Sequence, residues 1–484
     1  MIRAWIEEAA ARHGADVYLA DARGAGSLTY AGLLDVVRET ERRLDDAGLP
    51  PGARVSVRLA DPLDYATALV ALIAAGRVAV PLDPGAPDTD IARVLDVARP
   101  AGVVTGRAPA GPDATGGDGK GGDTLPFGIT AVDLSPLTSS TDGGGIFLCT
   151  SGTTGTPKGI LLREAQLAHV ASSVVGWHRL SRADRGYCSL PLFHVNAEVV
   201  GLLGTLRAGA YLAVDRKFSR RGFWERITAD RITWINAVPA IISILAMDPP
   251  ASPPTALRFV RSASAPLPLA ALERFEKAIG VPVIETYGMT EAASMITANP
   301  LDGPRKPGSA GKPAGSEVRI GGAGPTADIG RVLIRGGGVI TAYASGGRPG
   351  AIDDDGWLDT GDLGYLDEDG YLFLVGRSDD VINRGGEKIY PREIEEVLLA
   401  QPGVRSAAVI GAVDEVLGER PVAYVVPDGG TVADEVEALL RAVCAEQLPR
   451  HKQPSEFWLV DEMPLGPTGK ISRRLLKESV AAPS

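Results

Sequence analysis

Cysteine is rare in this chain, whose 484 residues include only Cys149, Cys188 and Cys444. The three lie far apart, and no two have the spacing of a metal-binding pair. A disulfide-stapled scaffold and a cysteine-based metal module are therefore excluded, and the unpaired thiols predict a protein of the reducing cytoplasm. The N-terminal residues Met1–Glu8 also lack the apolar core of a secretory signal, and their pattern is typical of an amphipathic helix.

Long hydrophobic runs are missing as well. The longest apolar stretches cover residues 66–81 and 199–214, and Arg77 and Arg207 interrupt them. A membrane-spanning helix needs about 20 consecutive apolar residues. The sequence therefore predicts a soluble protein that has no membrane partner.

Positive charge is scarce, since the net charge is −11 and only ten lysines accompany thirty-nine arginines. An acidic chain without a basic cluster excludes the electrostatic footprint of a nucleic-acid-binding protein. An anionic substrate would have to meet positive charge that is placed locally. Three of the ten lysines, Lys158, Lys388 and Lys470, lie in glycine-containing motifs.

The hydrophobic pattern is typical of alternating helices and strands. Helices are expected at Tyr30–Ala47 and Leu63–Ala75, and strands at Val55–Val57 and Val78–Leu82. This alternation predicts an α/β fold in which helices cover a mostly parallel sheet. The glycine-rich residues 106–126 cannot bury a core and predict a flexible surface segment.

A smaller unit of about one hundred residues follows Arg377, as expected for a separate domain of this size. Its predicted elements are a helix at Pro391–Ala400, a strand at Ser406–Ile410, a helix at Val432–Gln447 and a strand at Glu456–Val460. The pattern predicts a small α+β domain after a larger α/β region.

The stretch Ser151–Gly159 packs four hydroxyl side chains, three glycines and a lysine into nine residues, directly after the apolar run Ile146–Cys149. Glycines let backbone N–H groups approach an anion, and hydroxyls and a lysine add donors and charge. The spacing is not that of the Walker loop. The motif predicts a polyphosphate cradle, the alternative being a flexible surface turn.

A second motif, Tyr287–Glu291, follows a short apolar strand and combines an aromatic ring, a glycine, a hydroxyl and a carboxylate. The ring can stack on a base, and Glu291 can bind Mg²⁺ together with phosphate oxygens. Taken alone, a Thr–Glu pair is more often a helix cap than a functional site.

Further motifs lie at Trp357–Asp362, Val375–Asp380, Arg384–Ile389 and Pro467–Ile471. Together and in this order, all these stretches resemble the adenylate-forming superfamily of acyl-CoA synthetases, peptide-synthetase adenylation domains and firefly luciferases. The resemblance runs from about Leu28 to Lys470.

The resemblance implies a large N-terminal region, residues 1–378, of two α/β subdomains and a β-barrel. A small mobile α+β domain, residues 379–484, would follow it and rotate about Asp379 between two half-reactions. In the first half a carboxylate attacks the α-phosphate of Mg²⁺·ATP, which gives an acyl-adenylate and pyrophosphate. In the second half a thiol, that of coenzyme A, displaces AMP and forms an acyl thioester.

Roles for individual residues follow from the same resemblance. The catalytic set would be Lys470, Thr290, Glu291 and His194, with Glu291 as the Mg²⁺ ligand. The nucleotide and coenzyme A set would be Thr150, Ser151, Gly152, Thr153, Thr154, Lys158, Ser264, Ala265, Pro266, Tyr287, Asp362, Arg377, Gly385, Gly386 and Glu387. The wall of the acid pocket would be Val174, Asn196, Asn236, Ala237, Val238, Ser262 and Gly288.

The acid itself is constrained by the region Pro191–Ala197. Relatives that activate amino acids place an aspartate near here, and none is present, so an α-amino acid is not expected. Ligases of oxalate and malonate carry His-Val-His-Gly, of which this chain retains His194 but has Asn196-Ala197 in place of the last two residues. The small, neutral wall predicts a bulky, largely apolar acid, such as one from natural-product biosynthesis.

Four alternatives remain open at this point. The acid could be a small dicarboxylate of the oxalate or malonate type. The acyl group could pass to a carrier protein or leave as acyl-AMP. The chain could be a nucleotide-binding relative without catalysis, and His194 could be a core histidine instead of a group that gates the carboxylate.

Overall fold

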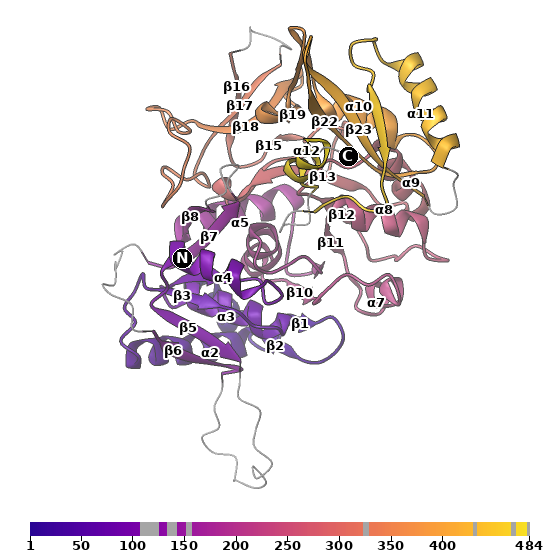
Figure 1. Ribbon diagram of the computed structural model, residues 1–484. Helices are drawn as coiled ribbons and strands as arrows, with labels where there is room; N and C mark the ends of the chain where they lie inside the picture. Colours follow the sequence, from indigo (N-terminus) through magenta and orange to yellow (C-terminus); the bar gives the residue numbers. More distant parts are fainter. Residues whose placement is uncertain are drawn as a thin grey trace.

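The computed structural model describes residues 1–106, 125–132, 143–151, 157–322, 329–428, 433–465 and 471–481. The expected surface segment 106–126 lies almost wholly outside this part of the chain. The earliest elements of the chain, drawn in indigo and violet, and the last elements, drawn in orange and yellow, occupy opposite ends of the molecule (Figure 1).

The first sheet has six strands in the order β6-β5-β3-β4-β7-β8. Its strands are β3 (Arg54–Val57), β4 (Val78–Pro81), β5 (Gly102–Gly106), β6 (Phe127–Ala131), β7 (Gly145–Ser151) and β8 (Pro157–Arg163). The central strands are parallel, and the β5–β6 and β7–β8 pairs are antiparallel. Parallel strands need covering on both faces, which explains their near-continuous hydrophobic sequence.

Helix α3 (Pro62–Ala74) lies between this sheet and the second one, because it contacts β3 and β4 as well as β1 and η1. Asp61 caps it by accepting the N–H groups of Leu63 and Asp64, and Pro62 occupies the first turn. Nearly every residue of α3 is buried, as expected for a helix that is apolar on all sides. The other helices of this region are α1 (Ile2–His13), α2 (Tyr30–Asp46) and α4 (Asp88–Ala98).

The second sheet has nine strands in the order β15-β14-β13-β12-β11-β9-β10-β1-β2. They are β1 (Val17–Asp21), β2 (Ser27–Thr29), β9 (Arg185–Cys188), β10 (Tyr211–Val214), β11 (Trp234–Ala237), β12 (Phe259–Ser262), β13 (Val283–Met289), β14 (Ser294–Ala298) and β15 (Lys312–Pro313). From β1 to β13 all neighbours are parallel, so the carboxyl ends of these strands meet at one edge. Ligands bind at such an edge in open α/β sheets.

Helical segments surround the second sheet. They are α5 (Glu164–His178), the π-helix η1 (Asn196–Leu203), α6 (Gly204–Ala208), α7 (Phe223–Ala229), α8 (Pro239–Met247), α9 (Leu269–Ile279) and the single turn η2 (Thr290–Ala292). Every residue of β11 and β12 is buried, including the polar Asn236 and Arg261. The predicted α/β architecture is therefore confirmed, and its central strands β11 and β12 hold three buried polar side chains, those of Asn236, Arg261 and Ser262.

A third subdomain is a four-stranded antiparallel sheet of β16 (Glu317–Gly321), β17 (Gly330–Arg335), β18 (Leu358–Leu366) and β19 (Leu372–Arg377). The expected β-barrel is not closed in the described residues, because β16 and β19 lie at opposite edges of the sheet. Four strands are too few to close a barrel around packed side chains.

The C-terminal elements form a separate layer. They are η3 (Ser378–Asp380), β20 (Ile382–Arg384), β21 (Glu387–Ile389), α10 (Pro391–Leu399), β22 (Val404–Asp414), β23 (Gly418–Pro427), α11 (Ala433–Gln447), β24 (Glu456–Leu459) and α12 (Arg473–Ala481). Ile394, Val409, Val425 and Leu440 belong to a core of their own. All four elements predicted here are present, and the small α+β domain is confirmed; its boundary at Asp379 stays a prediction.

Candidate active site

A hydrogen-bonded triad joins the carboxyl end of β13 to the β18–β19 pair. The Tyr287 hydroxyl donates to Asp362 Oδ2 at 2.5 Å, and Arg377 Nη1 lies 3.3 Å from Asp362 Oδ1. Asp362 and Arg377 face each other across the antiparallel ladder. The sheet fixes the backbones of Asp362 and Arg377, and the hydrogen bond from Tyr287 holds its ring next to the Asp362 carboxylate. The sequence predicted all three as nucleotide-binding residues, and the structure brings them together.

A second chain of contacts links the phosphate motif to the predicted metal ligand. The hydroxyl of Tyr343 donates to Glu291 Oε1 at 3.1 Å, and Lys158 Nζ lies 5.7 Å from the centre of the Tyr343 ring. Glu291 is 7% exposed, so its carboxylate is buried, with the Tyr343 hydroxyl as a donor beside it. Mg²⁺ at ATP sites uses one or two carboxylates with phosphate oxygens, and Glu291 fits that requirement.

Tyr343 was missed by reasoning from sequence, because its position depends on a distant pairing. The segment that follows it runs against β8: Ala344 N–H donates to the carbonyl of Gly159 at 2.9 Å, and Gly159 N–H donates to that of Ser345 at 3.0 Å. A Cβ at Gly159 would lie 2.6 Å from Ser345 Oγ and 2.7 Å from Phe147 Cζ. The last glycine of the phosphate motif is thus required for this close approach.

The backbone at the strand ends is unusually constrained. A Cβ at Gly288 would lie 1.5 Å from the carbonyl oxygen of Ser294, so only glycine fits there. Ser264 has φ 76° and Ala293 has φ 49°, both in the left-handed region. Non-glycine residues in this region cost of order 1–3 kcal/mol each and cluster at functional sites. Ser264 belongs to the segment predicted to face the adenine.

The phosphate motif itself is described only at its two ends. Thr150 on β7 is paired with Lys158 on β8, so the motif connects two antiparallel strands. The predicted residues Gly152, Thr153 and Thr154 lie outside the described residues, as does the side chain of Ser151.

Lys470 also lies outside the described residues, although both flanks of its segment are placed. Leu465 is bridged to Ile471, and Ser472 N–H donates to the carbonyl of Pro464 at 2.8 Å. On α12, Arg473 contacts Glu395 at 2.7 Å and Asp380 at 3.4 Å. The base of the lysine segment is therefore anchored next to the predicted hinge residue, Asp379.

Four predicted wall residues of the acid pocket lie together. Asn236 Nδ2 donates to Asn196 Oδ1 at 3.4 Å, and Ala237 is paired with Ser262 across β11 and β12. Arg261, which sequence reasoning missed, lies between the two asparagines: its Nη1 donates to Asn196 Oδ1 at 2.7 Å and to Asn236 Oδ1 at 3.1 Å. The available signal was a single charge inside the apolar strand Phe259–Ser262.

The remaining predicted residues are more dispersed. Val174 packs against Gly204 in the core, while Val238 precedes α8. The His194 ring lies 4.7 Å from that of Phe193, and its carbonyl accepts N–H groups from the start of η1. Gly385 and Gly386 form the exposed β20–β21 turn with φ 61° and 94°, next to Glu387. The roles assigned to these residues stay predictions, as do those of Ala265, Pro266 and Thr290.

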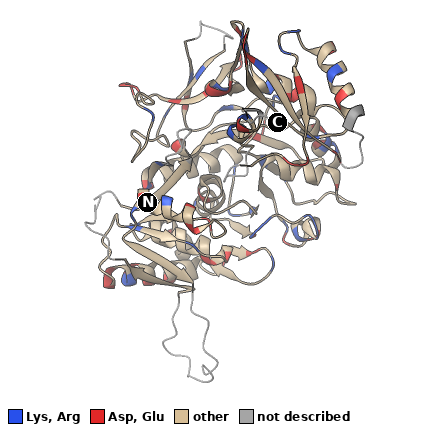
Figure 2. Cartoon of the chain, viewed as in Figure 1, with Lys and Arg blue, Asp and Glu red and all other residues tan. Residues whose placement is uncertain are grey.

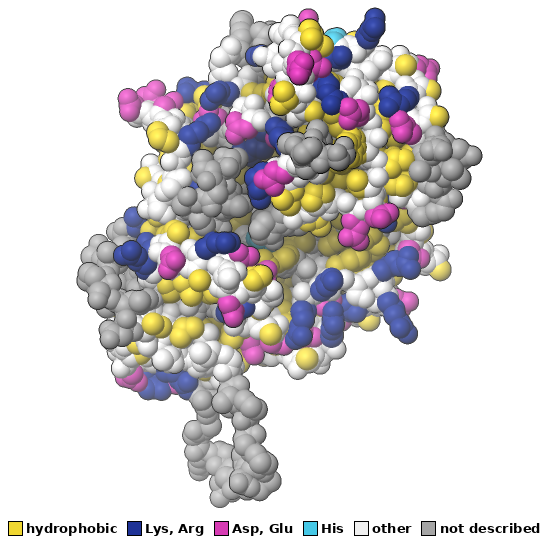
Figure 3. Space-filling view, viewed as in Figure 1, with side chains coloured by type: hydrophobic (Ala, Val, Ile, Leu, Met, Phe, Trp, Pro, Cys, Tyr) yellow, Lys and Arg dark blue, Asp and Glu magenta, His cyan; other side chains and the backbone are white. Residues whose placement is uncertain are grey.

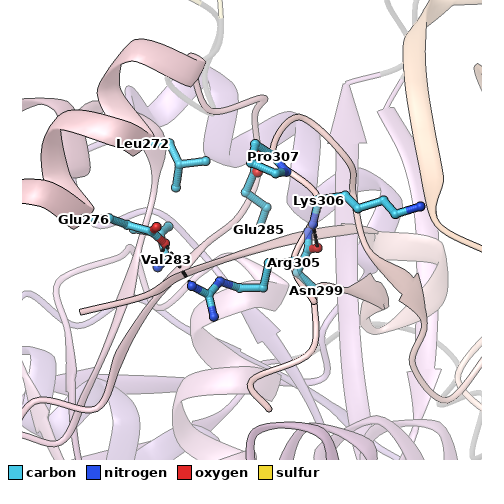
Figure 4. A pocket seen from close by; sticks show the side chains of 8 residues that line it. All are labelled: Leu272, Glu276, Val283, Glu285, Asn299, Arg305, Lys306 and Pro307. Carbon is cyan, nitrogen blue, oxygen red and sulfur yellow. Dashed lines mark hydrogen bonds and ion pairs between the residues drawn. The ribbon is translucent and has the colours of Figure 1, made fainter. Parts of the chain in front are cut away.

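A small cavity of about 80 Å³ lies at the other end of β13, away from this cluster (Figure 4). Its lining residues are Leu272, Glu276, Val283, Glu285, Asn299, Arg305, Lys306 and Pro307. Burial raises the pKa of Glu285 to about 7, against one opposing hydrogen bond from Gly308 N–H. None of the predicted site residues lines this cavity.

Charged residues of both signs occur along the N-terminal and the C-terminal elements that are visible in Figure 2. In the space-filling view, hydrophobic side chains gather along a hollow beneath the C-terminal elements (Figure 3). No helix in the described ranges is long and apolar enough to cross a bilayer.

Comparisons with known proteins agree with this geometry. Residues 6–344 match the AMP-binding enzyme family, and residues 393–470 match the AMP-binding enzyme C-terminal domain. The chain is similar to the sulfoacetate–CoA ligase of Cupriavidus necator, with 37% identity over 485 residues that cover 94% of this chain and 93% of the relative. It is also similar to the oxalate–CoA ligase of Arabidopsis thaliana, with 36% identity over 485 residues and 94% of each chain covered.

The structure is similar to a crystal structure of ATP-bound MatB from Rhodopseudomonas palustris, with a TM-score of 0.85, 28% identity and 99% of both chains covered. The chain therefore belongs to the AMP-binding enzyme family, and it is an AMP-forming acid–CoA ligase that uses ATP, Mg²⁺ and coenzyme A to convert a carboxylic acid, through an acyl-adenylate, into its thioester.

Proposed function

We propose that adenylation takes place between the Tyr287–Asp362–Arg377 triad and the Lys158–Tyr343–Glu291 contacts. The observation that carries this assignment is the position of Tyr287 and Glu291, which lie four residues apart at the carboxyl end of β13. Tyr287 contacts Asp362 of the triad, and Glu291 contacts Tyr343 of the second set. Tyr287 would stack on adenine, with Ser264, Ala265 and Pro266 on the opposite face. Asp362 would accept hydrogen bonds from both ribose hydroxyls, while Glu291 would hold Mg²⁺.

The first half-reaction joins two anions. An oxygen of the substrate carboxylate attacks the α-phosphorus, and the bond from that phosphorus to the bridging oxygen of pyrophosphate breaks. Catalysis of this kind is mostly positioning and charge stabilisation, so no nucleophilic side chain is needed. Lys470 would contact both the carboxylate and the α-phosphate, and Thr290 would donate to the α-phosphate.

The second half-reaction uses another face of the C-terminal domain. The sulfur of coenzyme A attacks the acyl carbon, loses its proton, and AMP leaves with the bonding electrons of the acyl–oxygen bond. Gly385, Gly386 and Glu387 would line the channel for the thiol after rotation about Asp379. A turn built from two glycines presents backbone with no side chain in the way, which supports this role.

The acid is not an α-amino acid in this proposal. Arg261 is hydrogen-bonded to the predicted wall residues Asn196 and Asn236, and a buried guanidinium repels an α-ammonium group. Two relatives act on sulfoacetate and on oxalate, small acids that each carry a second anionic group. The polar set of Asn196, Asn236 and Arg261 favours a small acid of this kind over the bulky apolar acid expected from the sequence.

Pyrophosphate release with a panel of carboxylic acids tests the proposed function. With ATP and Mg²⁺, at least one non-amino acid should release pyrophosphate, and coenzyme A should then convert the adenylate into a thioester. Turnover that does not depend on coenzyme A would point to a carrier protein or to release of acyl-AMP. No pyrophosphate with any acid would contradict the proposal.

A further inference from the structure

Arg261 is a charged side chain in the middle of the second sheet. It is 1% exposed, and the neighbouring strand β11 contributes Asn236 directly opposite it. Among the described residues no carboxylate forms an ion pair with it. A buried cation without a counter-ion is rare, because burial of an unpaired charge costs several kcal/mol.

The nitrogen atoms of the Arg261 guanidinium are unequally hydrogen-bonded. Nη1 donates to the side-chain oxygens of both Asn196 and Asn236, whereas Nε has no acceptor in the described part of the chain. Asn196 Nδ2, on the same side chain whose Oδ1 accepts from Arg261, likewise has no partner among the described residues. The Nη1 side of the guanidinium is thus fixed by the two amides, and two unused donors, Arg261 Nε and Asn196 Nδ2, remain.

The titratable groups around Arg261 cannot neutralise it. His178 on α5 is fully buried, and burial, together with Arg261 and Arg258, lowers its pKa to about 3. Cys188 on β9 is a buried thiol whose pKa burial raises to about 11. Both are uncharged near neutrality, while the pKa of Arg261, lowered to about 9 by burial, leaves the guanidinium charged there.

The position of this cluster relates it to the acid. Arg261 comes one residue before Ser262 at the carboxyl end of β12, and Asn196 opens the helix η1 that follows His194. Asn196, Asn236 and Ser262 are three of the residues assigned to the pocket wall. The charge therefore lies directly behind the predicted wall that the acyl group would contact.

We propose that Arg261, held by Asn196 and Asn236, binds a second anionic group of the acid substrate, a carboxylate or a sulfonate. This inference rests on the proposed function, because it concerns the acid that is adenylated. Guanidinium binds such planar or trigonal anions through two parallel N–H groups, and the Nε edge of Arg261 is available for one of them. Asn196 Nδ2 supplies a further donor for the same anion.

The competing explanation is purely structural: Arg261 would only tie η1 to β11 and β12 through the two asparagines. That role predicts a loss of stability when Arg261 is replaced, and equal loss of activity on every acid. An anion-binding role predicts a loss that depends on the charge of the acid.

Paired acids of nearly equal size separate the two explanations. The panel contains malonate, succinate and sulfoacetate, together with the monomethyl esters of malonate and succinate, and kcat/KM is measured by pyrophosphate release. The wild-type chain should prefer a dianionic acid to its ester. Arg261→Met should lower kcat/KM for the dianion by about 10–150-fold, the loss expected for a charged hydrogen bond, and should change the value for the ester less than about threefold. Arg261→Lys should restore part of the preference.

A second variant keeps the inference testable if Arg261→Met does not fold. Asn236→Asp places a carboxylate 3.1 Å from Nη1, at the position of the present amide oxygen. This internal counter-ion should raise the melting temperature, and it should raise KM for the dianion several-fold more than KM for the ester. A structural role alone would raise stability without changing the preference between the two acids.

The outcomes are distinct. Loss restricted to dianionic acids supports the inference. Equal loss on dianions and esters, or wild-type preference for an ester, overturns it while leaving the proposed function intact. If the wild-type chain releases no pyrophosphate with any acid, the proposed function fails and the inference fails with it.

Discussion

Replacement of Asp362 by asparagine tests the nucleotide site most directly. The side chain is 14% exposed, accepts a hydrogen bond from Tyr287 at 2.5 Å and lies 3.3 Å from Arg377. Asparagine keeps the shape but removes the charge, and hydrogen bonds to charged groups contribute about 1.5–3 kcal/mol. We expect kcat/KM for ATP to fall about 10–150-fold, mainly through KM, with a melting temperature close to that of the wild type.

Two comparisons show whether the loss comes from the ribose. Tyr287→Phe removes only the hydroxyl that Asp362 accepts, so it should cost less than Asp362→Asn. With 2′,3′-dideoxy-ATP in place of ATP, kcat/KM of the wild-type chain should fall to about the value that Asp362→Asn has with ATP. The same change of nucleotide should lower kcat/KM of Asp362→Asn only slightly. If Asp362→Asn lowers kcat/KM by the same factor for ATP and for the dideoxy nucleotide, Asp362 does not bind the ribose hydroxyls.

Three further results are expected. Lys470→Ala should abolish adenylate formation yet still convert supplied acyl-AMP into thioester; equal loss in both half-reactions would contradict its role. Gly288→Ala should reduce the free energy of unfolding in urea by about 1–3 kcal/mol, because the new Cβ would overlap the carbonyl of Ser294. Glu285, whose buried carboxyl has a pKa raised to about 7, stabilises the fold when protonated, so wild-type stability should fall as pH rises from about 4.5 to 7. Glu285→Gln should not show this fall, and the melting-temperature gap between the two chains should widen toward pH 8.

Local patterns predicted most of the fold. The helix Tyr30–Asp46 and the strand Arg54–Val57 lie within one residue of their expected limits, because amphipathic and apolar periods are properties of a short segment. The helix Ala433–Gln447 and the strand Glu456–Leu459 of the C-terminal domain agree equally well. The open sheet that replaces the expected barrel depends on how strands from different segments pair, and no single segment carries that information.

The site was predicted where a motif is contiguous and missed where it is assembled from a distance. Tyr287 and Asp362 lie in recognisable motifs, and they meet as expected. Tyr343 contacts Glu291 only because the segment after it pairs with Gly159, far earlier in the chain. Arg261 was missed because a single charged residue in an apolar strand does not change the hydrophobic pattern from which the strand is predicted.

Two arginines of the site, Arg377 and Arg261, differ in whether a carboxylate neutralises their charge. Arg377 is paired with Asp362, so its charge is largely offset and it mainly fixes the carboxylate that would hold the ribose. Among the residues that the structure describes, Arg261 has neutral amides as its partners, so its charge remains available to a ligand. A site with no net charge suits the uncharged ribose, whereas an uncompensated cation suits an anion. In a chain of net charge −11, this difference places selection for a second negative group at Arg261 and not at the nucleotide.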